Sequence, residues 1–283
     1  MPLVSTRDLL LDAKRGGYAV AAFNIENMEM AQIVIRTATE LRSPVIIQTT
    51  PGTVNYAGLD MLRAMVAVEA AKTDIPVAMH LDHGDSYERC IAAIGANYTS
   101  VMIDGSKLPY EENVALTKSV VDAAAKQDID VEGELGTLGG KEDTHEVKAG
   151  AEIYTDPAQA KDFAEKTGVH SLAVAVGTAH GFYKGEPKLD FDRLKKIIEL
   201  VNIPIVLHGA SGLPDEAVSR SVKLGVCKVN FATELRVAMT KGVREVLQDE
   251  SVYDPKVYMK QGKKYVAETV KHKILVCGCN GKA

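Results

Sequence analysis

The six residues from His80 to Asp85 read HLDHGD and follow the apolar run IPVAM. Two imidazoles and two carboxylates so close together suit two kinds of chemistry, because imidazoles bind transition metals and a neighbouring carboxylate can transfer protons. Residue types alone do not separate a metal site from a proton-transfer site. The elements that position these groups must decide which of His80, Asp82 and His83 takes which role.

Short runs rich in β-branched residues recur along the chain, and each begins after a Pro, a Gly or a polar break. Most are continuously hydrophobic, which is typical of parallel strands buried on both faces. Helical patterns, with apolar residues three and four positions apart, lie between them. The predicted strands are 18–24, 44–50, 76–82, 99–104, 130–135, 171–177, 204–209 and 227–232.

Eight strand–helix units within 283 residues predict an α/β protein folded as a (β/α)8 TIM barrel. Extra terminal helices are expected at roughly 5–16 and 255–273. No linker or low-complexity stretch marks a second domain, so residues 1–283 are expected to form one domain. A doubly wound open sheet is disfavoured, because no G-x-G-x-x-G motif follows the first strand.

In such a barrel the catalytic groups collect where the strands end. Three of the seven histidines, His145, His170 and His272, fall elsewhere and are expected to be solvated or structural. The convergence of the other four on one rim favours a shared ligand over separate structural roles. The polar residues delivered to that rim are Asn24, Thr49, Thr50, His80, Asp82, His83, Asp104, Glu132, Glu134, His180, His208 and Asn230.

Three neutral imidazoles around one ion, with open positions left for substrate, are the pattern of a catalytic zinc site. Iron and cobalt also accept imidazole ligands, so the residues do not select one metal. Asp104 and Glu134 are expected either to orient the imidazoles or to bind the ion themselves.

Two turns of small residues follow the last two predicted strands, HGASG at 208–212 and VNFAT at 229–233. Backbone N–H groups after the seventh and eighth strands of a barrel commonly bind phosphate, aided by a helix N-terminus. Simple tight turns would give the same pattern. The segment HGFYKGEP, 180–187, adds Gly181 and Lys184, and this lysine is either a phosphate partner or an ordinary solvated side chain.

The glycine-containing stretch 136–150 joins the fifth predicted strand to the next helix and carries Glu142 and Asp143. Long loops above a barrel often close over substrate. We expect a mobile loop whose acids face either the substrate or solvent.

A cation beside a phosphate pocket suits a small phosphorylated substrate. A metal that polarises a carbonyl stabilises an enolate, so the adjacent C–C bond can be broken or made. One group must take the proton from the hydroxyl at that bond and another must move protons at the remaining carbon, and Asp82 and Glu142 are the candidates. The alternative aldol chemistry uses a Schiff-base lysine. Lys228, the one lysine within a predicted strand, is expected at the opposite rim, which favours the metal.

Several long motifs resemble those of class II, metal-dependent ketose-bisphosphate aldolases, and the similarity runs over essentially the whole chain. These motifs are HLDHG, SVMIDGS, VEGELGTLGGKED, SLAVAVGTAHGFYKGEP, LVNIPIVLHGASGLPDE and KVNFATELR. Within that family, GTAHG, HGASGLPDE and the terminal CGC are most similar to the tagatose-1,6-bisphosphate branch. HLDHG and YKGEP are also similar to fructose-1,6-bisphosphate members, since tagatose enzymes often have a second His in place of Gly84.

The resemblance implies a lyase that cleaves D-tagatose 1,6-bisphosphate reversibly into dihydroxyacetone phosphate and D-glyceraldehyde 3-phosphate. Fructose 1,6-bisphosphate is the alternative substrate. A metal-dependent phosphosugar isomerase or epimerase would use similar ligands on the same barrel, and a silent companion subunit would lack them.

The same resemblance implies that His83, His180 and His208 bind one catalytic Zn2+, with Asp104 and Glu134 as secondary metal carboxylates. It implies that Asp82 exchanges a proton with the C4 hydroxyl and that Glu142 handles the enediolate proton. His80 is then left to orient Asp82 or fill the top of the barrel. Asp85 is expected to cap the following helix. The predicted substrate-binding residues are Asn24, Thr50, Gly181, Lys184, Gly209, Ala210, Ser211, Asn230, Phe231, Ala232 and Thr233.

The family also implies a monovalent cation, Na+ or K+, near the phosphate and a homo-oligomer, dimer or tetramer. Its tagatose branch often works with a non-catalytic companion subunit. Members commonly bind the second phosphate with a basic residue from a neighbouring subunit's tail segment. Here DPKVYMKQG offers Lys256 and Lys260 where arginine is frequent, so that contact has no assigned residue.

The net charge of −5 gives no argument for a nucleic-acid or anionic-membrane partner. No apolar stretch approaches the roughly 18–20 residues that span a bilayer, and the N-terminus lacks signal-peptide features, so a cytoplasmic protein is expected. Cys90, Cys227, Cys277 and Cys279 lack the paired spacing of a zinc site. We expect reduced cysteines in preference to a metal or redox site in the tail.

Overall fold

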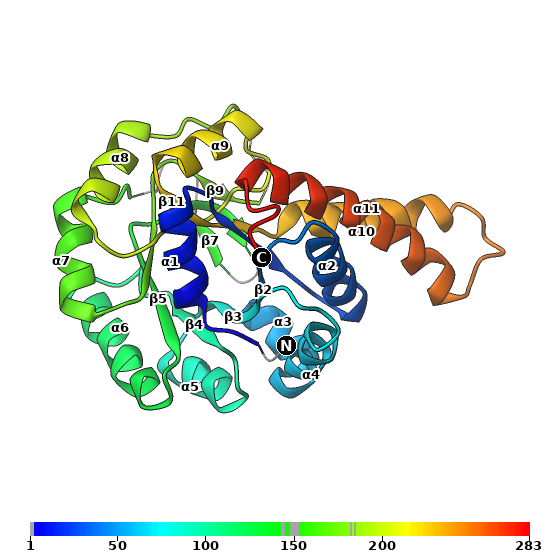
Figure 1. Cartoon of the computed structure of the whole chain (residues 1–283), viewed down its shortest axis with the longest axis horizontal. Helices are drawn as coiled ribbons and strands as arrows, with labels where there is room; N and C mark the ends of the chain where they lie inside the picture. Colours follow the sequence, from blue (N-terminus) through cyan, green and yellow to red (C-terminus); the bar gives the residue numbers. More distant parts are fainter. Residues whose placement is uncertain (1–2, 143–144, 148–152, 182, 184) are drawn as a thin grey trace.

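The computed structural model describes residues 3–142, 145–147, 153–181, 183 and 185–283, without the side chains of 141–142 and 145–147. Within these residues, eight parallel strands close into a barrel with helices around it (Figure 1). The predicted TIM barrel with additional helices at both termini is therefore confirmed.

The barrel strands neighbour one another in chain order, and the last pairs with the first, as the short strand–helix–strand units require. Each strand is buried along its length, which accounts for the continuous hydrophobic runs. The strands are β1 (Val20–Asn24), β2 (Val45–Thr49), β3 (Val77–Gly84), β4 (Ser100–Ile103), β5 (Asp130–Leu135), β8 (Ser171–Val174), β10 (Ile205–Leu207) and β11 (Val226–Phe231).

The helices bury one apolar face each against the barrel wall, as Val34 and Ile35 of α2 and Leu194 and Ile197 of α8 do. Among the described residues they are α1 (Thr6–Gly16), α2 (Met28–Glu40), α3 (Pro51–Ala57), α4 (Leu59–Ala70), α5 (Tyr87–Gly95), α6 (Tyr110–Ala124), the short 3-10 helix η1 (Ala125–Gln127), α7 (Pro157–Thr167), α8 (Phe191–Leu200), α9 (Asp215–Leu224), α10 (Thr233–Val246) and α11 (Pro255–Cys277). No helix in this part of the chain is both long and apolar enough to span a bilayer.

Local signals fix where the helices begin. The carboxylate of Asp156 accepts from two backbone N–H groups at the start of α7, which also has Pro157 at its first position. The predicted cap at Asp85 is wrong, because the Ser86 hydroxyl accepts from Arg89 N and caps α5 instead. Asp85 forms an ion pair with Arg89 one turn away, 3.2 Å apart.

The segment after β5 forms strands where a loop was expected. β6 (Gly139–Glu142) pairs with β7 (His145–Val147) antiparallel and with β9 (Ala179–His180) in parallel. His145 therefore begins a strand, and Asp143 lies outside the described residues. Through its pairing with β9, β6 holds the glycine-containing segment after β5 against the segment that carries His180.

The last two helices, α10 and α11, project from the side of the barrel as a two-helix hairpin (Figure 1). Their inner ends return to the wall, where α11 packs against α10 and α2. The C-terminal cysteines lie at that end, and Cys277 and Cys279 are buried free thiols like Cys90 and Cys227. Burial raises the pKa of the Cys90 thiol to about 12, so it stays protonated.

Candidate active site

Three histidines meet at the carboxyl end of the barrel. His83 lies near the end of β3, His180 in β9, and His208 just after β10, and all three are buried. His83 Nε2 lies 3.1 Å from His208 Nδ1, and the rings of His83 and His180 pack edge to face with centroids 4.9 Å apart. One ring nitrogen of each lies within 4.8 Å of the others. Three of the four histidines expected at this rim therefore meet there, whereas the fourth, His80, lies in the barrel interior.

A β-bulge allows two consecutive residues of β3 to face this centre. Neighbouring residues of a strand normally point to opposite faces. Here three steps along β3, from Leu81 to Gly84, oppose two steps along β4, and His83 adopts a φ of +50°. Gly84 is required beyond the bulge, because a Cβ there would collide with the Met102 carbonyl oxygen. The bulge brings Asp82 and His83 to the same site.

The donor set fits a single metal ion. Two nitrogens bound at about 2.0–2.1 Å to a tetrahedral zinc lie roughly 3.3 Å apart, close to the distance between His83 and His208. A cavity of about 20 Å³ adjoins His83 and His180, comparable to the space needed by one water-sized particle. Asp104 and Glu134 complete a second possible ligand group with His83.

The charges around the histidines also favour a cation. Burial, the largest influence, lowers the pKa of His180 and His208 well below the usual range, and the charge of His83 adds to it. Burial acts the same way on His83, but Asp82, Asp104 and Glu134 outweigh it and raise the pKa of His83. Two imidazoles are therefore neutral, and His83 carries a positive charge that a bound cation would replace.

The two neighbouring acids differ in protonation. Asp104 Oδ2 lies 3.0 Å from His83 Nδ1. Burial raises the pKa of Asp104, but the bond to His83 and the bonds from Ser106 have the larger combined effect, so the pKa is lowered. Burial and the charge of Asp104 raise the pKa of Glu134 well above the usual range. In the part of the chain that the structure describes, Glu134 Oε2 accepts no hydrogen bond. Such a buried oxygen is available to a cation or to substrate.

Asp82 is held by two amides. Its Oδ2 accepts from Asn24 Nδ2 at 2.7 Å and its Oδ1 from Asn230 Nδ2 at 3.2 Å. Asn24 is itself fixed by Gln48, whose Nε2 donates to Asn24 Oδ1 at 3.0 Å. Burial raises the pKa of Asp82, but the neighbouring imidazoles and the bond from Asn24 lower it overall. Asp82 is therefore an oriented carboxylate that can accept a proton.

The loops after β10 and β11 are bonded into one unit. Ser211 Oγ accepts from the backbone N–H of Ala232 at 3.2 Å. Gly212 N donates to Glu234 Oε1 at 2.7 Å, and Glu234 Oε2 pairs with the buried Lys273 Nζ at 3.0 Å. The N-terminus of α10 lies in the same unit, where its helix dipole favours an anion.

The remaining predicted substrate residues differ in where they lie. Gly181 and Gly209 have positive φ angles of +83° and +65° in the turns beside His180 and His208, and Thr233 opens α10. Thr50 caps α3, where its Oγ1 accepts from Thr53 N, and Ala210 is fully buried. The Phe231 ring stacks on Phe23 and is fully buried in the core. Lys184 and the side chain of Glu142 lie outside the described residues.

Lys228 was expected at the opposite rim, and this is wrong. Its side chain is fully buried inside the barrel, where Nζ lies 2.7 Å from Glu132 Oε2. Glu132 Oε1 in turn lies 2.8 Å from His208 Nε2. His80 also points to this layer, with Nδ1 2.7 Å from Ser100 Oγ. His80 therefore belongs to the barrel interior beneath Asp82, and Glu132 lies deeper than the rim.

Three other residues at the site were not predicted. Ser106 and Lys107 line the small cavity beside His83. The Tyr183 hydroxyl accepts from Ala179 N at 2.9 Å and donates to the Gly209 carbonyl oxygen at 2.7 Å. It links the turn beside His180 to the turn beside His208. The segment "GFYKG" gave no signal for this role, because the partners are distant in sequence.

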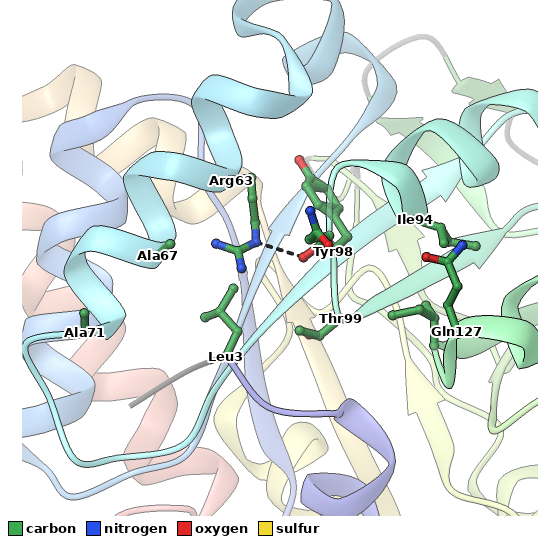
Figure 2. Close-up of a pocket in the computed structure, with 10 residues that line it drawn as sticks. Leu3, Arg63, Ala67, Ala71, Ile94, Tyr98, Thr99 and Gln127 are labelled. Carbon is green, nitrogen blue, oxygen red and sulfur yellow. Dashed lines mark hydrogen bonds between the residues drawn. The ribbon is translucent and has the colours of Figure 1, made fainter.

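A larger pocket, of about 500 Å³, opens at the amino ends of β4 and β5 (Figure 2). Arg63 enters it and donates from Nε to the Asn97 carbonyl oxygen at 2.8 Å. The described residues that line it include no histidine and no carboxylate. Its size alone does not make it a catalytic centre, and the cluster of three histidines is at the other end of the barrel.

The sequence-family model of the class II fructose-bisphosphate aldolases matches residues 4–282 of this chain. The chain belongs to this family. It is therefore an aldolase, a lyase acting on a phosphorylated ketose, and the family is generally metal-dependent. The histidine cluster provides a group that could hold that metal.

Solved structures of similar chains agree with this assignment. The YdjI aldolase of Escherichia coli K12 is 39% identical, with 99% of each chain covered and a TM-score of 0.88. A putative fructose-1,6-bisphosphate aldolase of Coccidioides immitis is 28% identical, covering 97% of this chain and 96% of that one, at a TM-score of 0.90. The fructose-bisphosphate aldolase of Campylobacter jejuni, at 23% identity, covers 100% and 97% with a TM-score of 0.85, and supports the fold.

Proposed function

We propose that this aldolase reversibly cleaves D-tagatose 1,6-bisphosphate into dihydroxyacetone phosphate and D-glyceraldehyde 3-phosphate. The observation that carries the aldol chemistry is the placement of Asp82, held by two amides, beside three converging histidines. The sugar is proposed from the similarity of GTAHG, HGASGLPDE and the terminal CGC to the tagatose branch. Fructose 1,6-bisphosphate is the second candidate, favoured by Gly84 in HLDHG and by YKGEP.

His83, His180 and His208 would hold Zn2+, with Asp104 and Glu134 nearby. When bound, the ion supplies Lewis-acid polarisation of the substrate carbonyl. Glu134, with a buried oxygen that accepts no hydrogen bond from the described residues, is the acid suited to a second contact with the ion. A monovalent cation, Na+ or K+, is proposed near the phosphate.

Asp82 removes the proton from the C4 hydroxyl during cleavage and returns it during condensation. The amides of Asn24 and Asn230 point N–H groups at its two oxygens, which fixes the direction from which it receives a proton. The loops joined by Ser211 and Ala232 hold the phosphate of the dihydroxyacetone unit beside the N-terminus of α10. Glu142 is proposed to move the proton at the carbon that the broken bond leaves behind.

The experiment that tests the proposal is a coupled assay for triose phosphate release from both bisphosphates. A higher kcat/KM for tagatose 1,6-bisphosphate supports the proposed sugar, and a higher value for fructose 1,6-bisphosphate selects the second candidate. Interconversion of sugar phosphates without triose release would identify an isomerase or epimerase. Chelation should abolish cleavage until zinc is restored, and borohydride with substrate should trap no covalent adduct.

We further propose that residues 1–283 act as one domain within a cytoplasmic homo-oligomer, dimer or tetramer. The similarity to the tagatose branch also suggests a non-catalytic companion subunit. Light scattering of the purified chain measures the size of the oligomer, and a cleavage assay of the same fractions shows whether the chain is active without a companion. Full activity of the isolated chain would exclude the need for a companion.

A further inference from the structure

Glu132 occupies the barrel interior directly beneath the three histidines. Its side chain is 2% exposed, and its two oxygens bind different partners. Oε1 lies 2.8 Å from His208 Nε2, whereas Oε2 lies 2.7 Å from Lys228 Nζ and 3.4 Å from Ser171 Oγ. The opposite nitrogen of His208, Nδ1, is the one that lies 3.1 Å from His83 Nε2. Glu132 therefore holds the side of the imidazole that faces away from the centre.

We propose that Glu132, anchored by Lys228, is a positioning residue that fixes the tautomer and the ring orientation of His208. The proposal rests on the proposed role of His208 as a metal ligand. It assigns a task to two residues of the barrel interior that are neither proposed metal ligands nor proposed substrate-binding residues.

The donor and acceptor properties of the groups determine the tautomer. A carboxylate accepts hydrogen bonds and donates none, and a neutral imidazole carries one N–H. The contact with Glu132 therefore places the His208 proton on Nε2. Nδ1 is left with its lone pair directed toward His83, as a metal ligand requires. The other tautomer would aim a proton at the ion and a lone pair at the carboxylate.

Lys228 explains how a carboxylate can occupy this position. An isolated charge costs several kcal/mol to bury, and a partner in hydrogen-bond contact offsets much of that cost. Both side chains are almost fully buried, 1% and 2% exposed, so solvent cannot take the place of Lys228. The pair also spans the barrel from β5 to β11, which limits rotation of the Glu132 side chain.

The other end of the histidine cluster uses the same arrangement. Asp104 Oδ2 lies 3.0 Å from His83 Nδ1, while His83 Nε2 faces His208. Each of the two imidazoles in closest contact is thus held by a carboxylate at its far nitrogen. Asp104 lies at the rim and is bonded to Ser106, whereas Glu132 lies in the interior and is bonded to Lys228.

The test uses metal affinity and the His208 tautomer, both measured without reference to turnover. The variants are Glu132→Gln and the double variant E132Q/K228M, which removes both charges and so leaves no buried lysine without a partner. Asp130→Asn is the matched control, because Asp130 lies on the same strand, is equally buried and is ion-paired with Arg7 at 2.7 Å. Zn2+ affinity is measured by chelator competition, and folding by circular dichroism.

We expect both Glu132 variants to bind Zn2+ about 10- to 100-fold more weakly than the unmodified chain, the range found for lost partners of ligating histidines. The control should lose stability and keep its affinity within about twofold. In the metal-free protein labelled with 15N-histidine, long-range 1H–15N spectra should show His208 protonated on Nε2, with the signal assigned through His208→Gln. That signal should become a mixture of tautomers in the double variant.

A double variant that folds and binds Zn2+ with unchanged affinity would overturn the positioning role. So would a metal-free protein in which His208 carries its proton on Nδ1. A His208→Gln chain that retains full affinity would instead overturn the proposed ligand, and with it the proposed function. The two failures are therefore distinguishable.

Discussion

The two ends of the barrel contain the same residue types, but their side chains are paired differently. At the amino end, Asp130 accepts from Ser5 Oγ, Thr6 Oγ1 and Arg7 N and is ion-paired with the Arg7 guanidinium. His170 there accepts from Val131 N through Nδ1 and contacts Arg7 through Nε2. Each of these residues has a partner of complementary kind within the cluster, and the two buried atoms there that make no hydrogen bond to the described residues, Arg7 Nε and Asp130 Oδ1, belong to the members of one ion pair.

At the carboxyl end the pairing is incomplete. Imidazoles face one another, three acidic side chains surround His83, and Glu134 carries a buried oxygen that accepts no hydrogen bond from the described residues. β5 illustrates the difference, because it carries Asp130, Glu132 and Glu134 at every second position. Asp130 is ion-paired at the amino end, whereas at the carboxyl end one oxygen of Glu134 has no hydrogen bond in the described part of the chain. A buried histidine or acid is therefore no indicator of function until its partners are known.

The largest difference in metal binding and activity is expected between two single variants, each with one histidine, at opposite ends of the barrel, replaced by alanine. His180→Ala should lose stoichiometric Zn2+ and all measurable cleavage, because it removes one of three proposed ligands. His170→Ala should retain both and lose only stability, by about 1–3 kcal/mol, since it leaves Val131 N without its acceptor. Metal analysis and chemical denaturation of the two variants measure this. Equal metal loss in both would contradict the comparison.

Asp82→Asn should lower kcat by about 10²- to 10⁴-fold, the usual contribution of a general acid–base group. The new amide keeps one oxygen to accept from Asn24 Nδ2, and Asn230 can turn its Oδ1, which accepts no hydrogen bond from the described residues, toward the new N–H group, so metal content should be unchanged. Steady-state kinetics and metal analysis on the same preparation separate the two effects. A kcat within tenfold of the unmodified enzyme would assign the proton transfer to another group.

Tyr183→Phe should raise KM about tenfold with a smaller change in kcat. The substitution removes both hydrogen bonds that join the turns beside His180 and His208, each worth about 0.5–1.5 kcal/mol. Tyr110→Phe is the control, since Tyr110 donates to Asp162 on the outer helices at 2.5 Å. If both variants show the same KM, the link between the turns is structural and does not affect substrate binding.

Asp130→Asn should have the smallest effect on catalysis and a clear effect on folding. It weakens the closed network at the amino end and should lower the free energy of unfolding by about 1–3 kcal/mol. The folded fraction should keep the unmodified kcat, which urea denaturation and active-site titration together measure. A reduced kcat per folded molecule would show that the two ends are coupled.

The barrel itself was predictable because its strands are marked by continuous apolar runs between turn residues. The predicted strand 130–135 coincides with β5, and the predicted terminal helix from 255 begins where α11 begins, at Pro255. The convergence of His83, His180 and His208 followed from the rule that strands of a barrel end at one rim. The order of strands and helices along the chain is sufficient to predict that these side chains lie at one rim.

The interior layer was not predictable from the same pattern. When a strand is buried on both faces, its sequence does not show which side chains point into the barrel and which point to the helices. Lys228 was therefore assigned to the wrong rim, and its pairing with Glu132 depends on contacts across 96 positions of sequence. The pairing of β6 with β9 was missed for a similar reason, since it depends on backbone contacts and few side-chain signals.

His83 adopts a left-handed backbone conformation that costs a residue with a side chain about 1–2 kcal/mol relative to the ordinary helical region. Glycine would adopt that conformation without the cost, and it would also remove the imidazole. Removing the imidazole would leave the buried Asp104 without its partner, a loss of about 3–5 kcal/mol that exceeds the relief of backbone strain. The strained backbone at this bulge is therefore maintained by the contacts of the side chain it carries, and a heat-resistant form of this enzyme has to be sought at other positions.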